Sequence, residues 1–217
     1  MGKDLDYIYS SRKYFLASAG IFIFSFVIGL LISAKNPEAS ENLLGLLKET
    51  YGSITSLEPF GRMLEIFKNN VRNSFMALLF GLGFGIVPFV FVAINGIVLG
   101  ILVEFFLKKQ GTFFVIAAIL PHGIIELPMV IMSVGIGFRL GHAAYFSTRH
   151  QKTTHELLNE LKQGVIFYFK IVVPLLLLAA LVESYITPLF IYNLSSCFPH
   201  NITCTQYADR SLGSAHP

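Results

Sequence analysis

The sequence of 217 residues contains no tryptophan and only two cysteines, and charged residues make up only 13 % of it. Soluble domains usually carry about 25 % charged residues, so the low charge argues against an ordinary soluble domain. The net charge is only +3, whereas nucleic-acid binding needs a basic stripe or cluster. We therefore expect no nucleic-acid partner.

Signatures of catalysis and metal binding are also missing from the sequence. The chain has no His-Glu-x-x-His, the pattern of helical zinc proteases. His122 and Glu126 offer at most two ligands, fewer than the three that catalytic zinc usually takes from protein. Ser133 has no Gly-x-Ser-x-Gly context. We expect no enzyme activity, no metal and no cofactor.

What the chain has instead is hydrophobicity: 54 % of its residues are hydrophobic. Long apolar blocks cover residues 14–34, 75–106, 113–146 and 164–192. A transmembrane helix needs about 20 such residues, and a signal peptide has only about 7 to 15, so the first block is a retained span. The composition predicts an all-α, polytopic helical membrane protein.

The two middle blocks are too long for one helix and too short for two full spans with a loop. Pro and Gly mark places where helices end or kink. We therefore expect breaks at Pro88 and Asn95-Gly96 in the second block, and at Pro121-His122-Gly123 and Pro128 in the third. The predicted spans lie near residues 14–34, 75–106, 113–127, 128–146 and 164–190.

Basic residues near span ends tend to stay in the cytoplasm. They occur in residues 1–13, at Lys108-Lys109 and in residues 139–164. Placing all three inside gives five crossings, a cytoplasmic N-terminus and an outer C-terminal tail, with the third block folded into a hairpin. A six-crossing alternative splits the second block at Asn95-Gly96 and places Lys108-Lys109 outside.

Two connecting segments have amphipathic patterns. Residues 35–72 carry spaced leucines and phenylalanines and equal numbers of basic and acidic residues, which predicts amphipathic helices outside the membrane. In the inner segment, Thr153 or Thr154 is suited to cap a short helix with Glu156 in its first turn. We treat residues 1–192 as one membrane domain and 193–217 as a polar tail, in which Cys197 and Cys204 are either bridged or free.

Five polar residues lie in apolar surroundings: Asn95, Glu104, His122, Glu126 and Glu183. Glu104 precedes Lys108 by four residues, which predicts an interfacial ion pair. His122 and Glu126 either satisfy backbone groups freed by the expected break or line a polar pocket or proton path; both interpretations stay open. We expect Asn95 to lie near His122 and Glu126.

Small residues favour close helix packing. Gly137 and Gly141 form a small-xxx-small spacing. The contact that they make lies either within one chain or between two copies, so a homo-oligomer is one expected partner besides the lipid bilayer.

These motifs together resemble the stage II sporulation protein M family of integral membrane proteins. The resemblance covers about residues 12–190 and rests on Asn69-Asn70, Asn95-Gly96-Ile-Val-Leu-Gly100, Ile119 to Pro128, Gly135 to Gly141 and Glu183-Ser-Tyr-Ile-Thr-Pro188. It implies about five crossings. The positions that match the family's motifs are Asn95, Pro121, His122, Gly123, Glu126, Glu183 and Pro188.

In spore-forming bacteria the family member anchors two cell-wall hydrolases, but relatives also occur in organisms that make no spores. The resemblance therefore implies a membrane scaffold or anchor for membrane or cell-envelope proteins. The alternative is an ion or small-solute transporter or channel subunit with a polar site inside the membrane.

Overall fold

The computed structural model describes residues 2–149 and 153–189. The C-terminal tail with Cys197 and Cys204 therefore lies outside the described residues. The described part consists of α1 (Gly2–Lys35), α2 (Pro37–Thr55), α3 (Pro59–Leu79), the 3-10 turn η1 (Phe80–Leu82), α4 (Ile86–Gln110), α5 (Thr112–Thr148), α6 (Thr154–Phe167), the π-helical turn η2 (Tyr168–Val172), α7 (Val173–Leu181) and the π-helical turn η3 (Val182–Ile186).

Among the described residues, four helical stretches are long and apolar enough to cross a membrane. They are Asp4–Lys35, Ile86–Gln110, Gly123–Thr148 and Thr154–Leu189, the last of which runs through α6, η2, α7 and η3. The predicted class of an all-α membrane protein with several spans is therefore confirmed.

Helices α1 and α4 pack against each other with their backbones in contact. A Cβ atom added to Gly100 of α4 would lie 2.2 Å from the Phe26 carbonyl oxygen of α1, and one added to Gly29 of α1 would lie 2.2 Å from the Ile97 oxygen. Gly96 likewise meets Phe22, so residue numbers rise together along both helices and the two helices are parallel. The predicted break at Asn95-Gly96 is wrong, because Gly96 and Gly100 form a small-xxx-small contact within a continuous α4.

Buried serines lie along α1 where it contacts α4 and α5, and Ser25 is one of the residues that face Gly96 of α4. Ser11, Ser18 and Ser25 are spaced by seven residues on α1 and are 0, 0 and 5 % exposed. Ser18 Oγ donates to the Ile131 carbonyl of α5 at 2.9 Å. These short side chains let α1 lie close to both neighbours.

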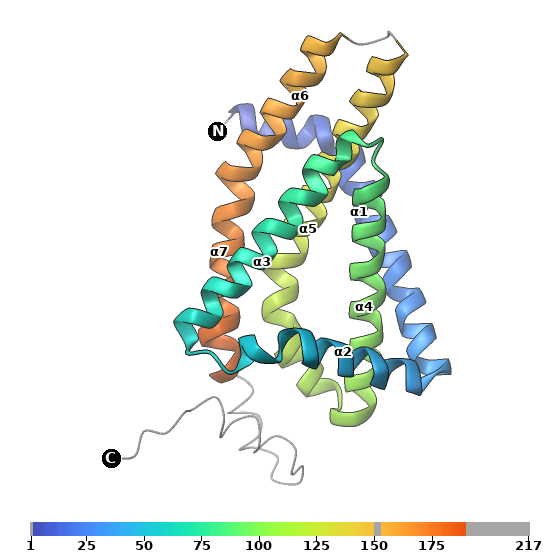
Figure 1. Cartoon of the computed structure of the whole chain (residues 1–217), viewed down its shortest axis with the longest axis vertical. Helices are drawn as coiled ribbons and strands as arrows, with labels where there is room; N and C mark the ends of the chain where they lie inside the picture. The colour runs from blue at the N-terminus through green and yellow to red at the C-terminus, as the bar shows by residue number, and fades with distance from the viewer. Residues whose placement is uncertain (1, 150–152, 190–217) are drawn as a thin grey trace.

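Because α1 and α4 are parallel, the chain must return along the bundle between them. Figure 1 shows α2 lying across the lower end of the bundle and α3 rising from there to the upper end, where α4 begins. Of the segment 35–72 that we expect outside the membrane, residues 37–55 form α2 at one end of the bundle, whereas residues 59–72 belong to a helix that runs along the spans (Figure 1).

The second apolar block is broken, but at a different place from the one predicted. The chain turns at residues 80–85, where Phe84 and Gly85 adopt positive φ angles of 58° and 79°. Pro88 lies in the first turn of α4, where a missing N–H leaves no hydrogen bond unmade. Its expected break is wrong for this reason.

The third apolar block contains no hairpin. Helix α5 is continuous from Thr112 to Thr148, through Pro121-His122-Gly123 and Pro128, although Figure 1 shows that it changes direction in its lower half. Membrane helices tolerate proline where neighbouring groups satisfy the freed carbonyl. The predicted spans 113–127 and 128–146 are therefore one helix, and this helix returns to the end of the bundle where the N-terminus lies.

This correction also moves Lys108 and Lys109. They end α4 at the end of the bundle where α2 lies, opposite the N-terminus (Figure 1), and Lys109 Nζ pairs with Glu41 of α2 at 2.9 Å. Lys108 pairs with Glu104 at 2.8 Å, as predicted. These two lysines therefore do not lie at the same end of the bundle as the basic residues of 1–13 and 139–164 (Figure 1), so the expectation that all three basic segments share one side is wrong.

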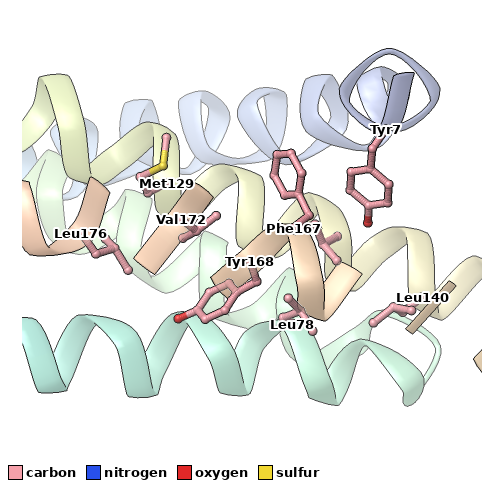
Figure 2. Close-up of a cluster of buried hydrophobic side chains, with 9 residues drawn as sticks. Tyr7, Leu78, Met129, Leu140, Phe167, Tyr168, Val172 and Leu176 are labelled. Carbon is pink, nitrogen blue, oxygen red and sulfur yellow. The ribbon is translucent and has the colours of Figure 1, made fainter. Parts of the chain in front are cut away.

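The core lies between α3, α5 and the last helix. Figure 2 shows part of it, with Tyr7 and Leu140 at one end and Leu176 at the other. The Phe167 ring lies between them, 4.9 Å from the Tyr7 ring between centroids (Figure 2). Gly137 and Gly141 make close contacts on α5: a Cβ on Gly137 would lie 2.8 Å from the Ala77 oxygen, and one on Gly141 would lie 2.5 Å from the Gly85 nitrogen. Their small-xxx-small contact is thus made within one chain.

Candidate functional site

Glu126 lies inside the bundle at about half its height. Its residue is only 6 % exposed. Gly137, eleven residues further along α5, contacts Ala77 of α3 and Pro88 of α4. Helix α3 runs parallel to α5, so eleven residues before Ala77 lies Ile66, about level with Glu126. Helix α4 runs antiparallel, so eleven residues after Pro88 lies Leu99 at the same level. Both positions are near the middle of their helices.

The Asn95 side chain makes its hydrogen bond within its own helix, α4. This half-buried residue donates from Nδ2 to the Phe91 carbonyl at 2.7 Å, and the same register places it about one helical turn above Glu126. The side chains of Pro121 and His122 lie outside the described part. That Asn95, His122 and Glu126 meet therefore stays a prediction.

The remaining predicted positions are spread along the bundle. A Cβ on half-buried Gly123 would find only Leu127 Cδ1 at 3.8 Å, an ordinary contact. Glu183 and Pro188 are half-buried at the end of the last helix, near the end where α2 lies. Gly164 contacts Ile136, which lies ten residues after Glu126 on α5. The last helix runs antiparallel to α5, so the residue level with Glu126 is about ten residues after Gly164, at Pro174. Glu183 lies nine residues, about 13 Å, beyond that level.

The polar character of α3 is the largest feature that the sequence reasoning missed. Glu65, Lys68 and Arg72 lie on its outer side, and the Glu65 and Lys68 side chains are 44 and 71 % exposed and paired at 3.0 Å. Lys68 is the tenth of the 21 residues of α3. A charged side chain at the centre of a membrane helix costs about 2.5–3.5 kcal/mol on insertion scales, which fits the finding that α3 is not among the four candidate spans of the described residues.

A hydrogen-bond network fixes the inner side of α3. Tyr168 of η2 is 0 % exposed and donates from its hydroxyl to the Val71 carbonyl at 2.8 Å. Ser74 Oγ lies 2.9 Å from the same hydroxyl and donates to the Asn70 carbonyl at 2.6 Å. Because this side of α3 is held by the last helix, its rotation is set and the charged side faces outward.

A second missed cluster joins α1, α5 and α6 at the end of the bundle where the N-terminus lies. Arg139 Nε donates to Glu160 at 2.7 Å, and its Nη1 donates to Ser10 and Ser11 at 2.7 and 2.6 Å. The guanidinium also stacks 4.6 Å from the Tyr7 ring centroid. The sequence signal for this cluster is an arginine within an apolar block, since such a residue needs polar partners.

The fold and these sites define a polytopic helical membrane protein, with charged residues both inside the bundle and on its surface. The stage II sporulation protein M family model matches residues 18–188. The chain therefore belongs to this family, and the resemblance noted from its motifs is confirmed.

A curated relative supports the same assignment. The chain is 30 % identical over 129 residues to the uncharacterized protein MJ0793 of Methanocaldococcus jannaschii, a match that covers 57 % of this chain and 70 % of the relative. No solved structure matches the chain.

Proposed function

We propose that the protein is a membrane anchor, without catalytic activity of its own, that binds partner proteins through α2 at one face of the bilayer. The observation that carries this proposal is the position of α2. It lies across the end of the bundle instead of joining the spans, so a whole helix surface faces out of the membrane (Figure 1).

Local interactions fix α2 in this position. Asn36 caps its first turn by accepting from Ala39 N at 3.3 Å, with Pro37 at the first helical position. Ser40, 1 % exposed, donates to Ser33 of α1 at 2.8 Å. The inward side carries half-buried leucines, and the outward side carries exposed polar residues and one exposed apolar residue: Glu38, Glu41, Asn42, Leu46, Lys48 and Glu49.

Charge favours an N-terminus in the cytoplasm and α2 outside. At the N-terminal end of the bundle, basic residues outnumber acidic ones. The residues there belong to the first half of α1, the last part of α5 and the first part of the last helix: the basic ones are Lys3, Arg12, Lys13, Arg139, Arg149, Lys162 and Lys170, and the acidic ones are Asp4, Asp6, Glu156 and Glu160. Basic residues near span ends favour the cytoplasmic side, so the partners of α2 are cell-envelope proteins.

Photo-cross-linking from α2 tests this function. A photoreactive residue replaces Leu46, which is 62 % exposed on α2, and a matched control replaces Ile94, which is 54 % exposed on α4. We expect Leu46 to give protein adducts in native membranes and Ile94 to give lipid adducts. An adduct protein must then bind the purified chain, and reversal of the Lys48 charge must weaken that binding. Lipid adducts alone at position 46 would refute the proposal.

The buried Glu126 favours a second function, in which the chain conducts an ion or proton. Intramembrane carboxylates commonly serve such pathways. Glu126→Gln keeps the size of the side chain and removes its charge. If the chain conducts, purified protein in liposomes gives ion or proton flux that this substitution abolishes; an anchor gives no flux with either sequence.

A further inference from the structure

The outer side of α3 combines charge with exposure along a helix that runs between the spans. We define the α3 strip as Glu65, Lys68 and Arg72, which lie three and four residues apart on one side of the helix. Lys68 and Arg72 are exposed, Glu65 is half-buried with 44 % of its side chain exposed, and Met76, 46 % exposed, continues the strip by one turn. Figure 1 shows α3 passing in front of α5, with no helix of the described part in front of it.

The length and position of α3 place this strip in the hydrocarbon. At 1.5 Å per residue, its 21 residues span about the thickness of the bilayer core, roughly 30 Å. Lys68 lies near the middle of that length. Lipid tails offer no partner to these charges, so a protein surface must cover the strip.

We propose that a second copy of this chain covers the α3 strip, giving a dimer whose two-fold axis is normal to the membrane. A two-fold interface brings one surface patch against itself and so requires a patch that complements itself. The α3 strip carries one acidic and two basic residues, and Glu65 pairs with Lys68 within each copy at 3.0 Å. Its complementarity across the two-fold axis therefore comes from an offset of one turn between Glu65 of one copy and a basic residue of the other. In two parallel α3 helices, Glu65 of each copy lies one turn from Lys68 of the other.

Apolar residues beside the strip complete the interface. Leu64 is 39 % exposed and Phe60 is 62 % exposed on the adjoining side of α3. In the dimer these side chains flank the charges and exclude lipid from them. The inner side of α3 is already held by Tyr168 and Ser74, so dimerisation requires no rearrangement of the bundle.

Cysteine cross-linking of the full chain tests the proposal. The chain's two cysteines, Cys197 and Cys204, are changed to Ser, and single cysteines are placed by Met76→Cys or Arg72→Cys on α3, or by Ile94→Cys on α4 as a control of similar exposure. We expect oxidation in membranes to give a covalent dimer from the α3 positions and not from position 94. No α3 dimer, equal dimer from position 94, or adducts only to a different protein would each overturn the assignment of a second copy.

A charge-swap pair examines the interface with purified protein. Glu65→Lys should weaken dimerisation by about tenfold, which corresponds to the loss of roughly one favourable contact, and mixing it with a Lys68→Glu copy should restore a heterodimer. Native mass spectrometry of the unmodified chain gives a reading that depends on no variant: twice 24.1 kDa supports the dimer, and a monomer overturns it. Neither measurement involves partner proteins, so each can fail while binding through α2 holds.

Discussion

Replacing Gly100 by Ala should destabilise the protein, because the new methyl group would push α1 away from α4. The added Cβ would lie 2.2 Å from the Phe26 oxygen and 2.9 Å from the Leu30 nitrogen, whereas carbon and oxygen normally approach to about 3.3 Å. The two helices must therefore separate by about 1 Å. Both obstructing atoms belong to the backbone, so no change of rotamer relieves the contact.

The expected cost is a loss of about 2 kcal/mol in the free energy of unfolding. Overpacking costs about 1–3 kcal/mol, and backbone obstacles favour the upper part of that range. The higher helix propensity of Ala returns up to about 1 kcal/mol. The chain has no tryptophan, so the helical circular dichroism signal in detergent is a suitable measure of thermal unfolding.

Gly20→Ala is the matched control, because a Cβ at Gly20 of α1 has nothing within 4 Å. It should leave stability unchanged or raise it. Gly29→Ala opposes the Ile97 oxygen at 2.2 Å and forces the same separation as Gly100→Ala, so the double substitution should cost less than the two singles added together. If Gly100→Ala unfolds at the same temperature as Gly20→Ala, the close parallel contact of α1 and α4 is wrong.

Three further predictions concern hydrogen bonds. Tyr168→Phe should lower the free energy of unfolding by about 1–2 kcal/mol, because it removes the hydroxyl that bonds α3. The control Tyr185→Phe, on an exposed ring, should leave this free energy unchanged. Equal effects of the two substitutions would contradict the fixed rotation of α3. Arg139→Met and Glu160→Gln, combined in a double-mutant cycle, should show a coupling of about 0.5–3 kcal/mol, and additive effects would refute that ion pair. Thr153→Ala should cost about 1 kcal/mol by removing the observed capping box of α6, seen as increased proteolysis of the α5–α6 connection.

Local patterns predicted the fold class and several contacts correctly. The capping box formed by Thr153 and Glu156 and the pair of Glu104 with Lys108 both occur as expected. Each depends on residues three or four apart on one helix, where spacing alone fixes the geometry. Helix α2 also forms where the leucine spacing predicted an amphipathic helix.

The structural role of a glycine or proline depends on the partner helix, which the sequence alone does not give. Gly96 next to Asn95 has the composition of a turn, but within an apolar helix the same glycine allows another backbone to approach, and Phe22 occupies that space. Pro88 has the composition of a break but lies in the first turn of α4. Its position in the helix became visible only once the turn at residues 80–85 was known.

Helix α3 shows why hydropathy alone gives four spans here. Its inward residues include Met63, Leu78 and the Ser74 that binds Tyr168, but the α3 strip on its outer side lowers the average below that of a span. Averaged hydropathy therefore does not identify α3 as a helix that runs along the bundle, but the parallel contact of α1 and α4 does. Two adjacent spans that run the same way require an intervening helix that runs back. Between residues 36 and 85, α2 lies across the end of the bundle (Figure 1), so the 21 residues of α3 must run back along it, whatever their polarity.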